Sequence, residues 1–434
     1  MAREYKDCGI EWIGQIPKEW EVNKINRLFG TIGSGTTPTS TDNDAYIGQI
    51  NWIQSGDLNG GVLREVKNRI SEDTLSKYSA LTVYKSPFII IAMYGASVGN
   101  ISISTIDGCC NQACCVLCKS NINFKYAFYT IKSSQRYLVY KAVGGGQPNI
   151  SQNTLKHLWI PVPNLQEQQK IADYLDKVCG EIDEMVTLQE TMVEELKAYK
   201  QSVITETVTK GLNPNAPMRN SGIDWIGEIP EHWDTGKTLY VLSLPITDGP
   251  HTTPDLFDDG VPFISADAVS DGYINFDNKR GFVSKEFYDE CCKKYIPQLY
   301  DVYMIKSGAS TGRTAIVETQ EIFTIWSPLA VFRANPEVMT PYYLLYMLRS
   351  DGYQKQVETF WSYGTQQNIG MRTLEKLIVC IPPLSEQRAI ASYLDTKCSE
   401  IDSLIALKQA KIEELKEYKK SVIYEYVTGK KEVV

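Results

Sequence analysis

The chain has 434 residues, of which 43% are hydrophobic and 22% are charged, and its formal net charge is −8. The length predicts two or three domains rather than one, and the charged fraction is ordinary for a soluble protein. No apolar run reaches membrane-spanning length, and the first residues lack the basic-then-apolar pattern of a signal peptide, so we expect a cytoplasmic protein.

Charge is unevenly distributed along the chain. Residues 21–156 carry 13 Lys and Arg against 8 Asp and Glu, whereas residues 234–375 carry 12 against 18. Only the first of these segments has the basic excess expected of a strong phosphate binder. If the chain binds DNA, partner subunits are expected to supply much of the nonspecific attraction.

Two segments of the chain recur. GIEWIGQIPKEW (Gly9–Trp20) returns as GIDWIGEIPEHW (Gly222–Trp233), and residues 165–209 align with residues 384–428 with 25 identities in 45 positions. The stretches between these matches share only short anchors: TTP in both, GASVG against GASTG, and GGGQPNI against YGTQQNI. The sequence therefore predicts a duplicated unit in which two divergent inserts alternate with two similar scaffolds.

The divergent inserts are rich in Ile, Val, Tyr and Gly, with short apolar runs separated by turn residues. Strands are expected at Ser86–Tyr94 and Asp301–Ser307, and helices at Asn123–Tyr140 and Thr340–Val357. The predicted fold class is α+β, with two mixed α/β domains and an internal pseudo-two-fold repeat.

The similar scaffolds are predicted to be long helices. In the first copy, apolar positions alternate in steps of four and three, interrupted by Gln189, at Ile171, Leu175, Val178, Ile182, Met185, Met192, Leu196, Tyr199 and Val203. In the second copy this apolar seam is interrupted more often, because Lys397, Lys408 and Lys411 stand at the corresponding positions. This spacing favours an antiparallel coiled coil of the two helices, each about 60 Å long; an external oligomerisation coil is the alternative.

The sequence offers no catalytic constellation and no metal site. It has no G-x-G-x-x-G or P-loop motif, no N-P-P-[YF] loop, and its three histidines, His157, His232 and His251, are far apart. A dense cysteine region contains a single C-x-x-C, Cys115 and Cys118, where structural zinc normally needs four ligands. Reduced thiols packed in a buried strand are expected there. We therefore expect no catalytic residue and no cofactor in this chain.

Two related domains held apart by a rigid coil would suit a protein that reads two short DNA segments at a set spacing. Base edges are read by polar and cationic side chains, which we sought on loops. Candidates in the first insert are Ser34, Thr36, Thr37, Gln54, Ser55, Asp57, Ser97, Asn100, Gln147 and Asn149. Candidates in the second are His251, Thr252, Thr253, Ser265, Asp267, Ser310, Arg313, Gln366 and Asn368. For most of them a turn or capping role is the simpler interpretation.

The repeated motifs resemble those of specificity subunits of type I restriction-modification systems. The resemblance rests on G-I-x-W-I-G-x-I-P-x-x-W, G-x-Q-x-N-I, P-x-L-x-E-Q-x-x-I-A-x-Y-L-D and E-E-L-K-x-Y-K-x-S-V-I-x-E, and it covers essentially the whole chain. It implies target-recognition domains at residues 21–155 and 234–374, and central scaffold regions at residues 156–212 and 375–434. Residues 1–20 would be an N-terminal scaffold segment, and residues 213–233 a linker with its repeat.

The resemblance also implies the partners of the chain. They are double-stranded DNA, two methylation subunits and translocase-nuclease subunits. S-adenosylmethionine, ATP and Mg²⁺ would belong to those subunits. Two alternatives stay open: a coiled-coil scaffold or adaptor without DNA recognition, and a self-contained methyltransferase or nuclease, which the missing motifs disfavour.

Overall fold

The computed structural model describes residues 3–39, 43–95, 97–142, 149–363 and 367–433. The chain divides into two compact units. The first unit comprises Met1–Gln189 and Ala410–Val434, and the second comprises Glu190–Gln409. Among the described residues, none of the helices is long and apolar enough to cross a membrane.

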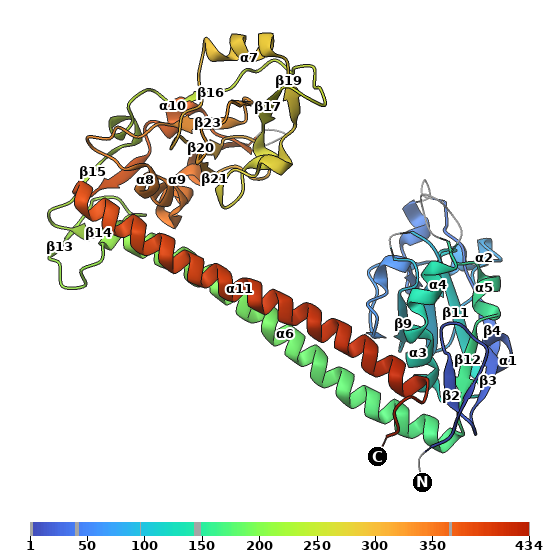
Figure 1. The fold of residues 1–434 in the computed structure, drawn as a ribbon. Helices are drawn as coiled ribbons and strands as arrows, with labels where there is room; N and C mark the ends of the chain where they lie inside the picture. Colours follow the sequence, from blue (N-terminus) through green and yellow to red (C-terminus); the bar gives the residue numbers. More distant parts are fainter. Residues whose placement is uncertain (1–2, 40–42, 96, 143–148, 364–366, 434) are drawn as a thin grey trace. The chain divides into compact units, whose positions relative to one another are not determined.

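The first unit is built around two sheets (Figure 1). The larger has the strand order β4-β11-β8-β9-β6, and the smaller β10-β5-β7. Its elements are β1 (Tyr5–Asp7), β2 (Gln15–Pro17), β3 (Glu21–Lys24), α1 (Ile25–Leu28), β4 (Phe29–Gly33), η1 (Asn43–Tyr46), β5 (Ile50–Ile53), η2 (Ser55–Asp57), β6 (Val62–Leu63), β7 (Arg69–Ile70), α2 (Glu72–Lys77), β8 (Phe88–Ala92), β9 (Ile101–Ser104), β10 (Cys109–Cys110), β11 (Cys114–Ser120), α3 (Phe124–Ser133), α4 (Gln135–Tyr140), α5 (Gln152–Lys156), β12 (Trp159–Val162) and the start of α6 (Leu165–Lys210).

The second unit repeats this topology with different side chains. Its sheets have the orders β16-β23-β20-β21-β18 and β19-β17-β22, which match those of the first unit strand for strand. Its elements are β13 (Met218–Asn220), β14 (Glu228–Pro230), β15 (Asp234–Lys237), η3 (Thr238–Val241), β16 (Thr247–Asp248), β17 (Val261–Ile264), η4 (Ala266–Ala268), β18 (Gly272–Tyr273), η5 (Phe276–Asn278), β19 (Gly281–Val283), α7 (Lys285–Cys292), β20 (Val302–Ile305), β21 (Thr314–Ile316), β22 (Thr324–Ile325), β23 (Leu329–Phe332), α8 (Pro341–Arg349), α9 (Asp351–Phe360), β24 (Ser362–Tyr363), β25 (Gln367–Asn368), α10 (Met371–Leu374), β26 (Ile378–Ile381) and α11 (Leu384–Val427).

The central strands are apolar on both faces because each face is covered. In β8, Ile89 and Ile91 belong to the core that includes α3, whereas Phe88, Ile90 and Ala92 face a second cluster. The predicted strands at Ser86–Tyr94 and Asp301–Ser307 therefore form β8 and β20, at the middle of each larger sheet. Continuous apolar runs are expected where both faces of a strand are buried.

Each of the two predicted insert helices is interrupted. The segment Asn123–Tyr140 forms α3 and α4, which meet at Ser134, and Thr340–Val357 forms α8 and α9, which meet at Ser350. Both serines are fully buried, and each Oγ donates to a carbonyl three residues earlier. This local bond competes with the helical pattern, which explains why the helix stops where periodicity predicted that it continues.

The long helices are confirmed, with 46 residues in α6 and 44 in α11. In the first unit Tyr174 contacts Tyr426 and Asp183 pairs with Lys419. The two helices are therefore antiparallel there. The seam differs from the predicted one, because Cys179 and Cys398 are buried in place of Val178 and Lys397. Met185 and Tyr199, which were predicted to lie in the seam, are 44% and 52% exposed.

The repeated opener motif has an architectural role. The indole N–H of Trp20 donates to Glu167 at 2.9 Å, and the indole of Trp233 donates to Glu386 at 3.0 Å. The neighbouring Gln168 and Gln387 accept backbone N–H groups at the start of α3 and α8. The E-Q pair of the scaffold motif therefore joins opener, insert domain and long helix within each unit.

Candidate nucleic-acid interface

In each unit, one pair of parallel strands ends beside a polar loop. β5 and β10 are parallel in the first unit, and β17 and β22 in the second. The backbone N–H of Asn111, after β10, donates to Ile53 O at 3.0 Å, and that of Trp326, after β22, donates to Ile264 O at 2.9 Å. Asn111 and Trp326 are therefore equivalent positions with different chemistry. The carboxyl ends of parallel strands are common ligand-binding edges.

The loop after β4 carries Ser34, Thr36 and Thr37 to this edge. Ser34 Oγ donates to Cys114 O at 2.8 Å, Thr36 O accepts from the Trp52 indole at 3.3 Å, and the Thr37 hydroxyl bonds the Gln112 side chain. Gly35 is required here, because a Cβ would lie 1.7 Å from Cys110 O. The loop is thus held tightly against β10, and of Ser34, Thr36 and Thr37 the last alone is exposed.

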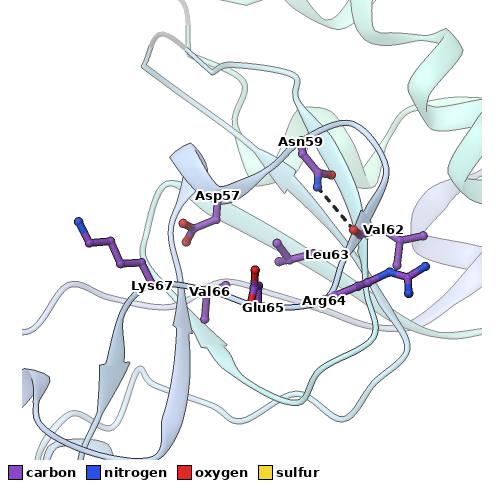
Figure 2. A pocket seen from close by; sticks show the side chains of 8 residues that line it. All are labelled: Asp57, Asn59, Val62, Leu63, Arg64, Glu65, Val66 and Lys67. Carbon is purple, nitrogen blue, oxygen red and sulfur yellow. Dashed lines mark hydrogen bonds between the residues drawn. The ribbon is translucent and has the colours of Figure 1, made fainter. Parts of the chain in front are cut away.

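Gln54 and Asp57 act first as caps. Asp57 accepts the backbone N–H of Gln54 at 2.8 Å, and Gln54 Oε1 accepts from Asn68 at 2.7 Å. Ser55 lies between them in η2. Figure 2 shows Asp57 and Asn59 beside residues 62–67, which together line an open cavity of about 560 Å³ of mixed charge.

Three further candidates lie elsewhere in the first unit. Ser97 O accepts the backbone N–H of Asn100 in a tight turn, and Asn100 Oδ1 accepts from Gln135 at 3.3 Å. Asn149 bridges to Tyr94, as Asn368 bridges to Ser307 in the second unit. Asn149 and Asn368 thus make the same contact in both units. Gln147 and Gln366 lie outside the described residues.

In the second unit, the loop after β16 surrounds a buried carboxylate. Asp248 is completely buried, and its oxygens pair with Lys294, with Lys306 at 3.3 Å and with His251 at 3.2 Å. His251 and Thr252 line an adjoining cavity of about 480 Å³. Two lysines and a histidine therefore surround one buried carboxylate in a segment whose overall charge is negative.

The remaining candidates of the second unit are dispersed. Ser265 is 3% exposed, whereas Thr253, Asp267 and Arg313 are exposed. Ser310 O accepts the backbone N–H of Arg313 at 3.1 Å in the turn after β20. Sequence reasoning missed Lys294, Lys306, Arg280 and Trp326, because their proximity to the loop comes from contacts between segments far apart in the chain.

The cysteine-rich strands are buried. Cys109, Cys110, Cys114 and Cys115 have essentially no exposed surface, and burial raises the pKa of Cys109 to about 11 and that of Cys115 to about 12. Among the described residues, no three His, Cys, Asp or Glu side chains gather as a metal site would require. These cysteines behave as small apolar residues in the core.

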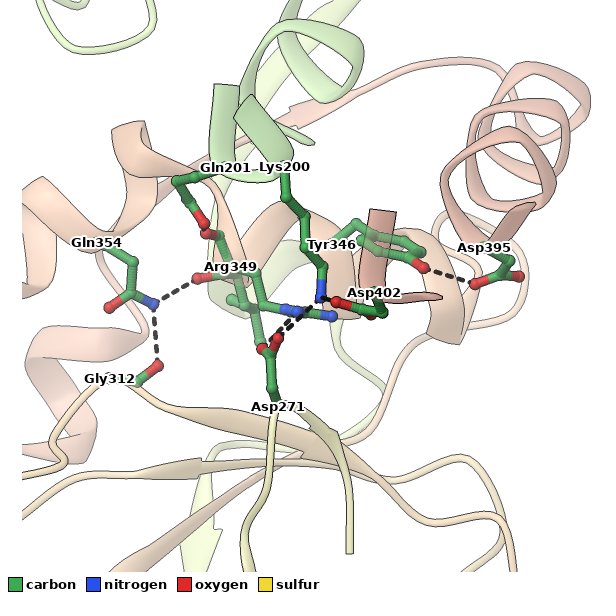
Figure 3. Close-up of polar contacts among 10 residues, drawn as sticks. Lys200, Gln201, Asp271, Gly312, Tyr346, Arg349, Gln354, Asp395 and Asp402 are labelled. Atoms are coloured by element: carbon green, nitrogen blue, oxygen red, sulfur yellow. Dashed lines mark hydrogen bonds and ion pairs between the residues drawn. The ribbon is translucent and has the colours of Figure 1, made fainter. Parts of the chain in front are cut away.

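A polar clamp ties the second insert domain to both long helices (Figure 3). Lys200 of α6 pairs with Asp402 of α11 at 2.8 Å and with Asp271 of the loop before β18 at 3.0 Å, and Asp271 also pairs with Arg349 of α8. Tyr346 donates to Asp395 at 2.7 Å in the same region. Asp402 and Lys200 occupy the repeat positions of Asp183 and Lys419, which pair in the first unit.

The first unit lacks an acid in place of Asp271. Lys132, the counterpart of Arg349, donates to the carbonyl of Gly60 and lies near Lys419. Burial, followed by the charge of Lys419, lowers the pKa of Lys132 to about 8. Between pH 8 and the ordinary lysine pKa, the unfolded chain binds more protons at this residue than the folded chain does. The buried charge of Lys132 therefore destabilises the fold fully below pH 8, and this destabilisation decreases as pH rises.

We therefore expect Lys132→Met to stabilise the first unit. The free energy of unfolding at pH 7 should rise by about 1–3 kcal/mol, and the difference from the parent chain should shrink between pH 8 and pH 10. Denaturant titrations across that pH range would measure it. Lys125→Met, on the exposed face of the same helix, should change stability little at either pH; an equal effect of both substitutions would contradict the assignment.

Proteins of known family are similar in sequence to this chain. The sequence profile described as "Type I restriction modification DNA specificity domain" matches residues 17–195 and 249–417. The putative type I restriction enzyme MjaX specificity subunit of Methanocaldococcus jannaschii is 26% identical, over 96% of this chain and 95% of its own length. The EcoBI specificity subunit of Escherichia coli is 25% identical over 59% of this chain and 55% of its own length.

Solved structures share the fold. One chain comes from a structure described as the basis of complex assembly and conformational transition of the type I R-M system. It aligns with a TM-score of 0.71 at 19% identity, covering 95% of this chain and 98% of the other. The HsdS subunit from Thermoanaerobacter tengcongensis aligns with a TM-score of 0.51 at 19% identity, with the same coverage of both chains. One matched segment of the profile falls in each copy of the repeat. The chain belongs to the type I restriction-modification DNA specificity family, and it is a non-catalytic subunit that determines DNA sequence specificity.

Proposed function

We propose that each insert domain reads one half of a bipartite DNA target, and that the paired helices set the gap between the halves. The observation that carries this proposal is the matched topology of the two sheets with different side chains at the same edge. Equal scaffolds with unequal contact chemistry suit the reading of two unlike half-sites. The coiled-coil adaptor without DNA recognition is not favoured, because the family match covers the first insert and most of the second.

The contact residues are proposed on the loops and strand ends at that edge. In the first domain, residues 21–155, they are Thr37, Gln54 and the neighbouring polar groups of the β4 loop. In the second, residues 234–374, they are His251, Thr252 and Thr253. The amide of Gln54 in the first domain suits adenine, and the hydroxyl groups of Thr252 and Thr253 in the second can bond base edges or phosphate.

The helices would also dock two methylation subunits. Support comes from apolar side chains that stay exposed on them: Met185, Leu188 and Tyr199 in α6, and Leu404, Leu407 and Tyr418 in α11. The two sets occupy the same positions of the repeat, so a partner that binds one set has a second, equivalent site. Those subunits would bring S-adenosylmethionine, and translocase-nuclease subunits would bring ATP and Mg²⁺.

Single-molecule methylome sequencing of a host carrying this chain and its methylation subunit would test the proposal. We expect one bipartite motif with an adenine marked on each strand. A continuous motif, or no motif in a host where both subunits are expressed, would contradict it.

Exchange of residues 21–155 for the corresponding insert of a relative should replace one half-site. The other half-site and the gap should stay unchanged, because the second insert and both helices are intact. The reciprocal exchange of residues 234–374 is the matched control and should alter only the other half. If either exchange changed both half-sites, the two insert domains would not read their half-sites independently.

A further inference from the structure

Arg280 and Trp326 form a stacked pair at the proposed DNA-reading edge of the second unit. The guanidinium carbon of Arg280 lies 4.1 Å from the centre of the Trp326 ring. Arg280 is exposed, and among the described residues no carboxylate lies within ion-pair distance of it. The pair therefore holds a cation at the surface without neutralising it.

Both members of the pair are anchored on one strand. The backbone N–H of Arg280 donates to Phe263 O and that of Trp326 to Ile264 O, each at 2.9 Å, so both residues are fixed to β17. The Trp326 ring also packs on buried Phe263, with ring centres 6.2 Å apart. The backbones of both residues and the Trp326 ring are thus held in place before any ligand arrives, and the ring offers the guanidinium a preformed platform, which reduces the entropy lost on binding.

The pair adjoins the loop that carries His251. The backbone N–H of Ser327 donates to Pro250 O at 3.2 Å, and that of Lys306 donates to Pro328 O at 2.8 Å. Lys294 and Lys306 pair with buried Asp248, whereas Arg280 pairs with no carboxylate among the described residues. Arg280 is therefore the group best prepared to meet a new acceptor.

We propose that Arg280 is a specificity-determining residue that reads a guanine in the half-site of the second domain, with Trp326 as the residue that positions it. A planar guanidinium donates two parallel bonds to O6 and N7 of guanine, and no other base presents that pair of acceptors in the major groove. A flexible lysine would suffice for phosphate, so the rigid stack points to a base. The proposal rests on the function proposed above. In the first unit Asn111 replaces Trp326, so that domain lacks this stack.

The test is Arg280→Lys in the full chain, expressed with its methylation subunit and read by methylome sequencing. Lysine keeps the charge but loses the bidentate fork. We expect one guanine position of one half-site to become degenerate, with about 10- to 100-fold lower discrimination, while the other half-site and the gap stay unchanged. Trp326→Phe keeps an aromatic platform and should retain the preference; Trp326→Leu should relax the same position.

Arg372→Lys is the matched control, because Arg372 is an exposed arginine of α10 in the same unit. It should leave the motif intact. Thermal melting of each variant separates misfolding from altered reading. If Arg280→Lys melts like the parent chain and methylates the parent motif with undiminished discrimination, the assignment of Arg280 is wrong. That result would leave the bipartite motif of the parent chain, and hence the proposed function, standing.

Discussion

Replacing Asp301 by alanine is expected to destabilise the second unit by about 3–5 kcal/mol. Asp301 is 1% exposed and accepts two bonds from Arg333, each 2.7 Å long, together with the hydroxyl of Tyr295 and the backbone N–H of Gln298. Removal of the carboxylate leaves the guanidinium of Arg333 partly buried without its counter-charge. Loss of a buried partner costs more than the pair contributes, because the remaining charge stays desolvated.

Amide hydrogen exchange in the full chain would measure this effect locally. Protection in β20 and β23 should fall, while β8 and β11 of the first unit keep theirs. Asp277→Ala, at an exposed carboxylate, should change stability by no more than about 0.5 kcal/mol. The double variant Asp301→Leu with Arg333→Met should recover part of the loss, since it removes both charges. Unchanged protection in Asp301→Ala would show that the cluster is not structural.

Lengthening both long helices should widen the gap in the DNA target. Seven residues inserted after Gln189 in α6, and seven after Gln409 in α11, add close to two turns to each helix, or about 10.5 Å. At about 3.4 Å per base pair, this corresponds to a gap wider by about three base pairs. Both half-sites should stay the same, because no residue of either insert changes.

The control for this experiment is the same insertion in α6 alone. The repeat then loses its register, and Lys200–Asp402 and Asp183–Lys419 can no longer both form, so we expect poor folding or loss of methylation. Methylome sequencing would be applied to the parent chain, the double insertion and the insertion in α6 alone. A constant gap in the double insertion, with methylation retained, would mean that the helices do not set the spacing.

The sequence alone determined the duplication, the helical scaffold and the α+β class. These features are local: the 45-residue repeat and the four-three spacing of Ile171, Leu175 and their successors require no knowledge of distant contacts. The central strands β8 and β20 could also be predicted, because strands buried on both faces leave continuous apolar runs. The residues that pack between the two helices were harder to predict, because the exposure of Met185 and Tyr199 depends on how the facing helix packs.

Only the tertiary structure decided which residues share a surface. Pairing of β17 with both β19 and β22 brings Arg280 onto Trp326, and the fold of the β16 loop places His251 beside Lys306 and Asp248. It also showed that Gln54 and Asp57 cap a turn, which loop chemistry alone could not separate from base contact. Sheet pairing joins residues far apart in the chain, and it leaves no periodic trace in the amino-acid order.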